Sequence, residues 1–406
     1  MLEVYIATNG CVEAQLSSTH VEQFFKKNKL PVTSNLAQAD LIIFYACGLT
    51  EQKEKDSLSA IRNIKTQMKP TARLIVWGCL PKINPKSLSP IYDGPLIGPQ
   101  DTSFFEEFIE IPVTRFRSIE KGRPADMLVA TETSTSCELC SIDPFTNLIL
   151  FAKQNWGRLR SHARKATNFF IRVATGCTGG CTYCSERCVF GRIQSRPIEE
   201  VISDFKWGLQ QGYNQFSLIA TDLGAYGQDR DLTLYDLLNK MIAVNPERNY
   251  RLILNQVSPS YLKRQFSQLE EIFASGKVKA LNCPVQSGSD RLLKLMGRTY
   301  TVGEWKDCML KTNRKFPNIK LSTHLMVGFP SETDEDFRET LKLLDYPPFL
   351  HDIYLFKFSR RPGVYASRMP EQVSEEIKES RCRKLLQTHA RKYALNAPIM
   401  YVRRFF

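Results

Sequence analysis

The stretch that decides the fold spans residues 170–184 and reads FIRVATGCTGGCTYC. It opens with a short apolar run, residues 170–173, which is typical of a buried strand. Three cysteines follow, Cys177, Cys181 and Cys184, with glycines before and between them. Glycine lets a backbone turn tightly and approach a ligand closely. The stretch therefore predicts a strand followed by a loop whose thiolates can surround one inorganic centre.

The spacing of this loop leaves two kinds of metal centre open. Three thiolates on a four-iron cluster leave one iron free for an external molecule, and cysteine thiolates are the usual ligands of iron–sulfur clusters. A structural zinc ion needs a fourth ligand. Cys188, four residues further on, could supply it. Spacing alone does not decide between the two.

Strand-like and helix-like segments alternate downstream of the loop. The strand candidates after residues 170–173 are residues 215–219, 251–254, 280–282, 320–324 and 353–356. Strand–helix alternation predicts a parallel sheet with helices on its faces. Six strands fall short of the eight in a closed barrel. We therefore expect a partial (β/α)6 barrel over residues 169–383.

Residues 1–110 alternate in the same way and form a separate α/β domain in this interpretation. Strands are expected at residues 2–8, 39–45 and 72–77, and helices at 12–27 and 50–68. Each strand ends close to a cysteine: Cys11, Cys47 or Cys79. The carboxyl ends of parallel strands meet at one edge of a sheet, so these three thiols should meet in space. The alternative is that one or more is an ordinary buried thiol.

Two segments fit neither domain. Residues 111–168 mix Pro, Ser, Thr and charge and indicate a linker or insertion. Its second half is basic, which is typical of a solvated linker or of a contact strip for an acidic substrate. Residues 384–406 form a basic C-terminal segment, whose helical part, within residues 377–395, should pack on the barrel.

Composition narrows the class of protein. The chain has 406 residues, 43% of them apolar and 24% charged, which is ordinary globular composition. There is no apolar run of membrane-spanning length and no secretory signal, so we expect a cytoplasmic protein with no membrane partner. In that compartment the 12 cysteines favour metal or redox chemistry over disulfides. The net charge of +13 permits an acidic partner without identifying one.

The pattern Cys177-x-x-x-Cys181-x-Tyr183-Cys184 resembles the signature of radical S-adenosylmethionine (SAM) enzymes. The resemblance implies a [4Fe–4S] cluster whose open iron chelates SAM. Reductive cleavage of SAM then gives a 5′-deoxyadenosyl radical that abstracts hydrogen from an unactivated carbon.

Together with Cys11, Cys47 and Cys79, the chain resembles the methylthiotransferase family of these enzymes. Further matching blocks are residues 195–197, 224–229, 283–289, 296–301, 327–333 and 358–363. The resemblance implies a flavodoxin-like N-terminal domain that holds a second, auxiliary [4Fe–4S] cluster through these three cysteines. It also implies an oxygen-sensitive enzyme that converts C–H to C–SCH3, with SAM as methyl donor and radical source and with sulfide on the auxiliary cluster. A reductant such as flavodoxin or ferredoxin is expected.

The resemblance also assigns residues to SAM. The expected contacts are Tyr183, Arg196, Asp222, Gln286, Ser287 and His324. All but Tyr183 have a structural alternative: a polar turn for Gln286 and Ser287, a helix cap for Asp222, and an ion pair with a surface acid for Arg196. His324 stands where family members commonly have Asp, and a histidine at a strand end is often only a core residue.

Other positions depart from the family pattern. Ala46 replaces the usual Asn in the block before Cys47, and Cys283 replaces the usual Leu. Cys283 is either a buried hydrophobe or a reactive thiol near the cofactor. Cys137 and Cys140 have no family counterpart and are expected to be exposed or locally packed thiols, with a disulfide or third metal site as the alternative.

The chain stops soon after the family core, where members acting on tRNA or ribosomal protein usually carry a TRAM domain. This favours a peptide or protein substrate, such as a ribosomally made precursor peptide, with tRNA as the alternative. Two other functions remain open at this point. One is a two-cluster radical SAM enzyme that thiolates or cross-links a peptide, and the other is a metal-stabilised nucleic-acid-binding protein.

Overall fold

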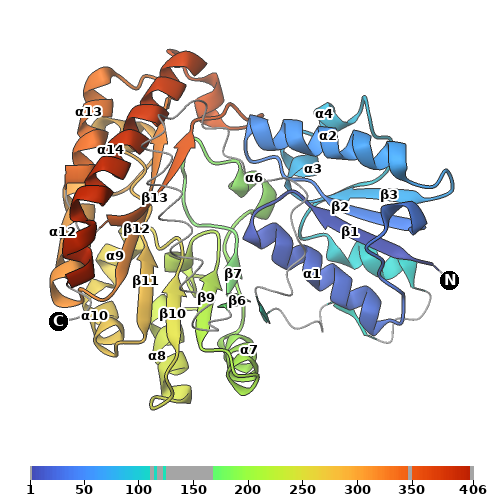
Figure 1. The fold of residues 1–406 in the computed structure, drawn as a ribbon, viewed down its shortest axis with the longest axis horizontal. Helices are drawn as coiled ribbons and strands as arrows, with labels where there is room; N and C mark the ends of the chain where they lie inside the picture. Colours follow the sequence, from blue (N-terminus) through green and yellow to red (C-terminus); the bar gives the residue numbers. More distant parts are fainter. Residues whose placement is uncertain (1, 110–113, 117–121, 125–167, 346–349, 403–406) are drawn as a thin grey trace. The chain divides into compact units, whose positions relative to one another are not determined.

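The computed structural model describes residues 2–109, 114–116, 122–124, 168–345 and 350–402 (Figure 1). The chain divides into two compact units, each assembled from separated stretches. The first unit comprises residues 1–136, 184–192 and 359–364, and the second comprises residues 137–183, 193–358 and 365–406. Among the described residues, none of the helices has the length and apolar character needed to cross a membrane.

A parallel sheet in the order β1-β2-β3-β4 forms the centre of the first unit. Its strands are β1 (Val4–Thr8), β2 (Leu41–Tyr45), β3 (Arg73–Trp77) and β4 (Leu96–Ile97). In the register, Thr8 lies opposite Tyr45 and Tyr45 lies opposite Trp77, so the three long strands end level with one another. This arrangement confirms the expected α/β class, and the two-residue strand β4 was not predicted.

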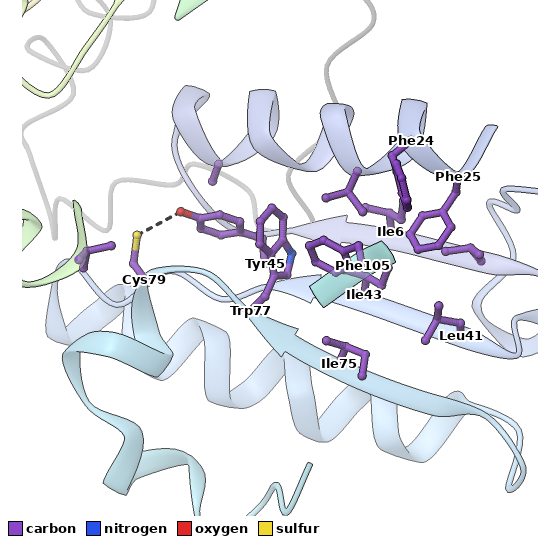
Figure 2. Packing of buried hydrophobic residues seen from close by; sticks show 14 of the residues in the cluster. Ile6, Phe24, Phe25, Leu41, Ile43, Tyr45, Ile75, Trp77, Cys79 and Phe105 are labelled. Carbon is purple, nitrogen blue, oxygen red and sulfur yellow. Dashed lines mark hydrogen bonds between the residues drawn. The ribbon is translucent and has the colours of Figure 1, made fainter. Parts of the chain in front are cut away.

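Helices cover both faces of this sheet. On one face, α1 (Val12–Lys27) packs Phe24 and Phe25 against strand residues such as Ile43 (Figure 2). On the other face, α2 (Glu51–Gln67) packs Ile61 and Ile64 against the opposite side chains of the same strands. Because both faces are covered, β2 is buried at every residue, which explains its unbroken apolar run.

Shorter elements complete the first unit. They are η1 (Leu36–Gln38), α3 (Cys79–Ile83), α4 (Pro85–Leu88), η2 (Thr102–Phe108), β5 (Gly122–Pro124) and α6 (Glu186–Phe190). The stretch containing α6 comes from far along the chain. Its Val189 and Phe190 lie in the same buried cluster as Tyr45 and Trp77.

Six parallel strands of the second unit lie in one sheet, in the order β13-β12-β11-β10-β9-β6. They are β6 (Asn168–Arg172), β9 (Gln215–Ile219), β10 (Arg251–Leu254), β11 (Val278–Asn282), β12 (Lys320–Val327) and β13 (Leu350–Lys357). Each is within a few residues of its expected position. The sequential order of parallel strands with intervening helices confirms the partial (β/α)6 barrel.

The helices between these strands are α7 (Ile198–Gln210), α8 (Leu234–Val244), α9 (Pro259–Arg264), α10 (Phe266–Ala274), α11 (Asp290–Leu295), α12 (Val302–Lys315) and α13 (Asp334–Lys342). The last helix, α14 (Glu375–Val402), buries Leu385 and Ala390, among others. Short elements are the antiparallel pair β7 (Ala174–Thr175) and β8 (Gln194–Ser195), and the turns η5 (Leu223–Ala225), η6 (Leu343–Asp345) and η7 (Tyr365–Arg368). The pair β7 and β8 was not predicted.

Most of the expected linker, residues 111–168, lies outside the described residues. This holds for Cys137 and Cys140 and for the basic segment before the barrel. The expectations made for these positions stay predictions, as do the domain boundaries at residues 110, 168 and 383.

Candidate iron–sulfur and SAM site

Cys11, Cys47 and Cys79 follow the three long strands of the first unit, as expected. Cys11 caps the start of α1, and Cys79 is the first residue of α3. Cys11 is exposed, whereas Cys47 and Cys79 are each only 4% exposed. Because β1, β2 and β3 end level with one another, the three thiols lie along one edge of the sheet.

The electrostatics of these thiols indicate that they are close neighbours. Burial raises the pKa of Cys47 and raises that of Cys79 well above its usual value. Negative charge on Cys47 and on Cys11 raises the pKa of Cys79 further. Thiolates are the form that binds metal, so without a positive centre these buried thiols hold their protons. A cluster bound here would supply the missing positive charge.

A buried polar clamp fixes the backbone of Cys47. The Cys47 N–H donates to Asn9 Oδ1 at 3.0 Å, and Ser57 Oγ donates to the Cys47 carbonyl at 2.7 Å. Asn9 Nδ2 in turn donates to Ser57 Oγ at 2.8 Å. Asn9 and Ser57 are fully buried. Both backbone polar groups of Cys47 are therefore paired within the protein.

The second trio begins directly after β6 and β7. Gly176, at φ +74°, turns the chain into Cys177. The Gly179 N–H donates to Cys177 Sγ at 3.2 Å, and a Cβ on Gly179 would lie 3.3 Å from Cys177 Sγ and 3.6 Å from Cys181 Sγ. The two sulfurs thus flank a glycine whose missing side chain leaves room between them. Such room beside two sulfurs fits a sulfur-rich cluster.

Contacts with the barrel hold this loop in place. The Thr182 N–H donates to the Met296 carbonyl at 3.0 Å, and the Thr182 carbonyl accepts from the Ala366 N–H at 2.8 Å. Cys184 follows Tyr183 directly, and its Sγ lies 4.0 Å from Glu186 Oε2. Burial raises the pKa of Cys177 to about 11, so this thiol too is protonated until a metal binds.

Arg298 is a site residue that sequence reasoning missed. Its guanidinium donates to the Tyr183 hydroxyl and lies 5.5 Å from the centre of the Tyr183 ring. Its positive charge lowers the pKa of Cys177, opposing the effect of burial. Arg298 belongs to the block 296–301, so the signal was present in the sequence, but no spacing rule connected it to Tyr183.

Asp222 and Arg196 are both engaged by the protein itself. Asp222 Oδ1 accepts from the Gly224 N–H at 3.0 Å and from the Ser258 N–H at 3.2 Å, so it is the cap of η5 that was held open as an alternative. Its charge still reaches Cys177, whose pKa it raises. Arg196 donates to Asp204 at 2.8 Å and to the Arg172 carbonyl at 2.7 Å, so it forms the expected ion pair with an acid.

Gln286 is the most unusual of the expected SAM contacts in its backbone. It adopts φ +77°, a left-handed conformation that a residue other than glycine rarely takes. Its N–H donates to the His324 carbonyl at 2.9 Å, and its carbonyl accepts from the Met326 N–H at 2.8 Å. Strain of this kind is concentrated at functional sites. The adjacent β12 thus holds Gln286 in position beside His324.

Ser287 and His324 lie in different surroundings. Ser287 is fully buried, and its hydroxyl contacts Thr340 Oγ1 at 3.2 Å and accepts from the Ser289 N–H at 3.1 Å, which is a polar turn. The His324 ring packs edge-on against the ring of Tyr354, with 5.0 Å between ring centres. Burial, and then the charge of Arg298, lower the pKa of His324 to about 4. His324 is therefore a neutral imidazole at pH 7, unlike the carboxylate common in the family.

The other described cysteines have simpler surroundings. Cys188 is exposed in α6. Cys283 is completely buried, and its carbonyl accepts from Trp305 Nε1 at 3.1 Å, which fits the expected buried hydrophobe. Within the part of the chain that the structure describes, no three His, Cys, Asp or Glu side chains converge on a point where one metal ion could bind.

Two family models match the chain in the regions where the two trios lie. The radical SAM superfamily matches residues 171–344, and the uncharacterized protein family UPF0004 matches residues 3–94. The first match contains the loop trio, and the second contains Cys11, Cys47 and Cys79.

Curated relatives match nearly the whole chain. A probable threonylcarbamoyladenosine tRNA methylthiotransferase of Methanothermobacter thermautotrophicus is 30% identical over 381 residues, covering 93% of this chain and 82% of the relative. The ribosomal protein uS12 methylthiotransferase RimO of Protochlamydia amoebophila is 29% identical over 385 residues, covering 93% and 74%. The threonylcarbamoyladenosine tRNA methylthiotransferase MtaB of Thermotoga maritima is 28% identical over 389 residues, covering 94% and 80%.

Solved structures show that the fold is shared more widely. The radical SAM methyltransferase TsrM of Kitasatospora setae superposes with a TM-score of 0.59 at 13% identity, covering 90% of this chain and 77% of that one. At that identity the likeness concerns the fold alone. The relatives, the two family models and the paired cysteine trios agree, and they exclude the non-enzymatic alternative. The chain belongs to the radical SAM methylthiotransferase family and is an enzyme that transfers a sulfur-containing group.

Proposed function

We propose that this enzyme converts an unactivated C–H bond of its substrate to C–SCH3 with two [4Fe–4S] clusters. Cys177, Cys181 and Cys184 would hold the cluster that binds SAM. Cys11, Cys47 and Cys79 would hold the auxiliary cluster. The observation that carries the proposal is that three cysteines far apart in sequence end three adjacent strands at one sheet edge, in a chain that also has a complete loop trio.

The clusters and SAM, when bound, supply the carbon radical, the methyl group and the sulfur. The protein's own residues position and shield them. Tyr183, oriented by Arg298, and Gln286, held in a left-handed conformation, are the SAM contacts that the geometry supports best. His324 would contribute a neutral ring, and Asp222 a buried carboxylate within electrostatic reach of Cys177. Arg196 and Ser287 would act through the groups that they already contact.

For the substrate, we propose a tRNA nucleoside. Most of the relatives named above and others of similar likeness are named as tRNA methylthiotransferases. The net charge of +13 suits a polyanion. A protein substrate is the second candidate, because one relative is named for ribosomal protein uS12. The sequence favoured a peptide or protein substrate, with tRNA as the alternative. The names of the relatives support the tRNA alternative better. A cytoplasmic location and a flavodoxin or ferredoxin reductant belong to the same proposal.

Iron analysis and paired variants test the cluster assignment. Anaerobically reconstituted protein should hold about eight iron per chain, four for each cluster. The variant with Cys11, Cys47 and Cys79 all replaced by Ala should keep half of the iron, cleave SAM to 5′-deoxyadenosine and form no methylthio product. The variant with Cys177, Cys181 and Cys184 replaced by Ala should also keep half of the iron, and it should cleave no SAM. About four iron per chain in the parent protein, or methylthio product from the first variant, would contradict the proposal.

The substrate is tested with the same protein. Reduced enzyme is incubated with SAM and either total tRNA or purified uS12, and the products are examined by mass spectrometry for a gain of one SCH2 unit. Gain on a nucleoside supports the tRNA proposal, and gain on the protein alone overturns it. A gain of sulfur without the methyl group would favour thiolation, the alternative that the sequence left open.

A further inference from the structure

The ring of Tyr45 lies in a slot between the two glycines that precede Cys11 and Cys79. A Cβ on Gly78, which has φ +110°, would lie 2.7 Å from two carbons of the Tyr45 ring. A Cβ on Gly10 would lie 3.6 Å from the same ring. The Trp77 ring packs edge-on against it, with ring centres 4.8 Å apart. The backbone before Cys79 is thus shaped around this one side chain, whereas a Cβ on Gly10 would first meet the Cβ of Ala14, at 2.2 Å.

The slot aims the Tyr45 hydroxyl at Cys79. The hydroxyl oxygen lies 3.2 Å from Cys79 Sγ, as the dashed line in Figure 2 shows. Tyr45 is 1% exposed and Cys79 4% exposed, so water does not compete for this contact. Either group can donate while the thiol is protonated. Once the sulfur binds iron as a thiolate it has no proton, and the tyrosine hydroxyl is then the donor.

We propose that Tyr45 is a positioning residue that acts through Cys79 and raises the reduction potential of the auxiliary cluster. A hydrogen bond withdraws negative charge from the ligand sulfur and so favours the reduced cluster, which carries one more electron. The inference rests on the proposed function, because it needs a cluster at Cys11, Cys47 and Cys79. Tyr45 thereby sets how readily the cluster that supplies sulfur accepts an electron.

The hydroxyl of Tyr92 provides a matched control in the same unit. Tyr92 is also buried, and its hydroxyl accepts from the Val76 N–H at 3.1 Å and donates to the Leu74 carbonyl at 3.0 Å. Tyr92→Phe therefore removes a buried hydroxyl that contacts the backbone of β3 and leaves the hydrogen bond between Tyr45 and Cys79 in place.

The experiment uses the full chain with Cys177, Cys181 and Cys184 replaced by Ala, so that only the auxiliary cluster remains. Tyr45→Phe and Tyr92→Phe are added separately, and each protein is titrated with reductant under EPR detection at matched iron content. Tyr45→Phe should disfavour reduction about tenfold, a shift of about 59 mV to more negative potential for a one-electron couple. Tyr92→Phe should leave the potential unchanged. Equal potentials for the parent and Tyr45→Phe would overturn the inference.

A second variant covers the case in which Tyr45→Phe loses iron. 3-Fluorotyrosine at position 45 changes the ring by one small atom and has a more acidic, more strongly donating hydroxyl, so the potential should shift in the positive direction. An unchanged or more negative potential contradicts the inference. If the parent protein holds no cluster, the proposed function and the inference both fail. If it holds a cluster that neither change at Tyr45 affects, only the inference fails.

Discussion

The two cysteine trios are assembled by different means. Cys177, Cys181 and Cys184 lie within one loop, and the chain itself keeps them close. Cys11, Cys47 and Cys79 lie on three separate strand ends and are brought together only by the parallel sheet. Glycine serves the two differently as well. Gly179 leaves space beside two sulfurs, whereas Gly78 leaves space for the ring of Tyr45.

This difference predicts how each trio responds to mutation. A loop trio depends on local backbone turns, so most changes around it should affect the cluster and leave the unit folded. A strand-end trio depends on the packing of the whole sheet, so changes around it should reduce both the stability of the fold and the binding of the iron–sulfur cluster. The predictions that follow test this contrast.

The largest effect is expected at Gly78, compared with Gly180 in the loop. Gly78→Ala places a Cβ against Tyr45 at φ +110° and should destabilise the first unit by about 3 kcal/mol or more. A Cβ on Gly180 would meet no atom within 4 Å, so Gly180→Ala should change stability by less than about 1 kcal/mol. Anaerobic urea denaturation, with iron measured on the same samples, checks both. Equal losses at the two positions would remove the contrast.

A smaller difference is expected between two hydroxyls, one beside each trio. Ser57→Ala removes the buried group that joins Asn9 to the Cys47 carbonyl and should cost about 2 kcal/mol. Thr178 is exposed, and its Oγ1 contacts the hydroxyl of buried Tyr261 at 2.7 Å, so Thr178→Val should cost less than about 1 kcal/mol. The same denaturation series measures both. A larger loss for Thr178→Val would show that the loop depends on packing as much as the sheet edge does.

The smallest expected effect is the response of His324 to pH. Burial favours the neutral form of both kinds of group: it raises the pKa of Cys79 and lowers that of His324 to about 4. Since the folded pKa lies below the usual 6.5, His324 has no effect on stability above pH 6.5. Its burial reduces stability as pH falls from 6.5 towards 4.

NMR of 13C-labelled histidine measures this directly. The His324 signal, assigned by its loss in His324→Gln, should not titrate between pH 8 and 5.5. A midpoint near 6.5 for His324 would mean that its ring is solvated, and the neutral contact proposed for SAM would then be wrong.

Much of the fold followed from periodicity and apolar runs alone. The helix expected at residues 12–27 and the strands at 215–219 and 251–254 match the structure at both ends. Strand β12 was predicted three residues too short, because polar His324 was interpreted as its end, whereas the alternating burial continues through Leu325 and Val327. The two-residue strands β4, β7 and β8 escaped prediction because so short a segment shows no periodicity.

The site was predicted in part, and the omissions have a common cause. The cysteines stood out by residue type, and their placement at strand ends followed from the topology. Tyr45, Asn9, Ser57 and Arg298 did not stand out, because each acts through a contact with a residue distant in sequence. Asn9 meets Ser57 across 48 positions, for example. Family resemblance named Asp222 and Arg196 but did not foresee that the protein's own groups already engage them.

The first unit is assembled from separated stretches of the chain, and this affects how a truncated N-terminal fragment would behave. A fragment ending near residue 110 would keep all three strand-end cysteines but lose Val189 and Phe190 from its apolar cluster. It would also lose Arg361, whose guanidinium pairs with the carboxylate of Glu54. Such a truncation exposes apolar surface and leaves the carboxylate of Glu54 without the guanidinium that it pairs with. An insoluble N-terminal fragment would therefore reflect the position of the truncation and would carry no information about whether this unit binds iron.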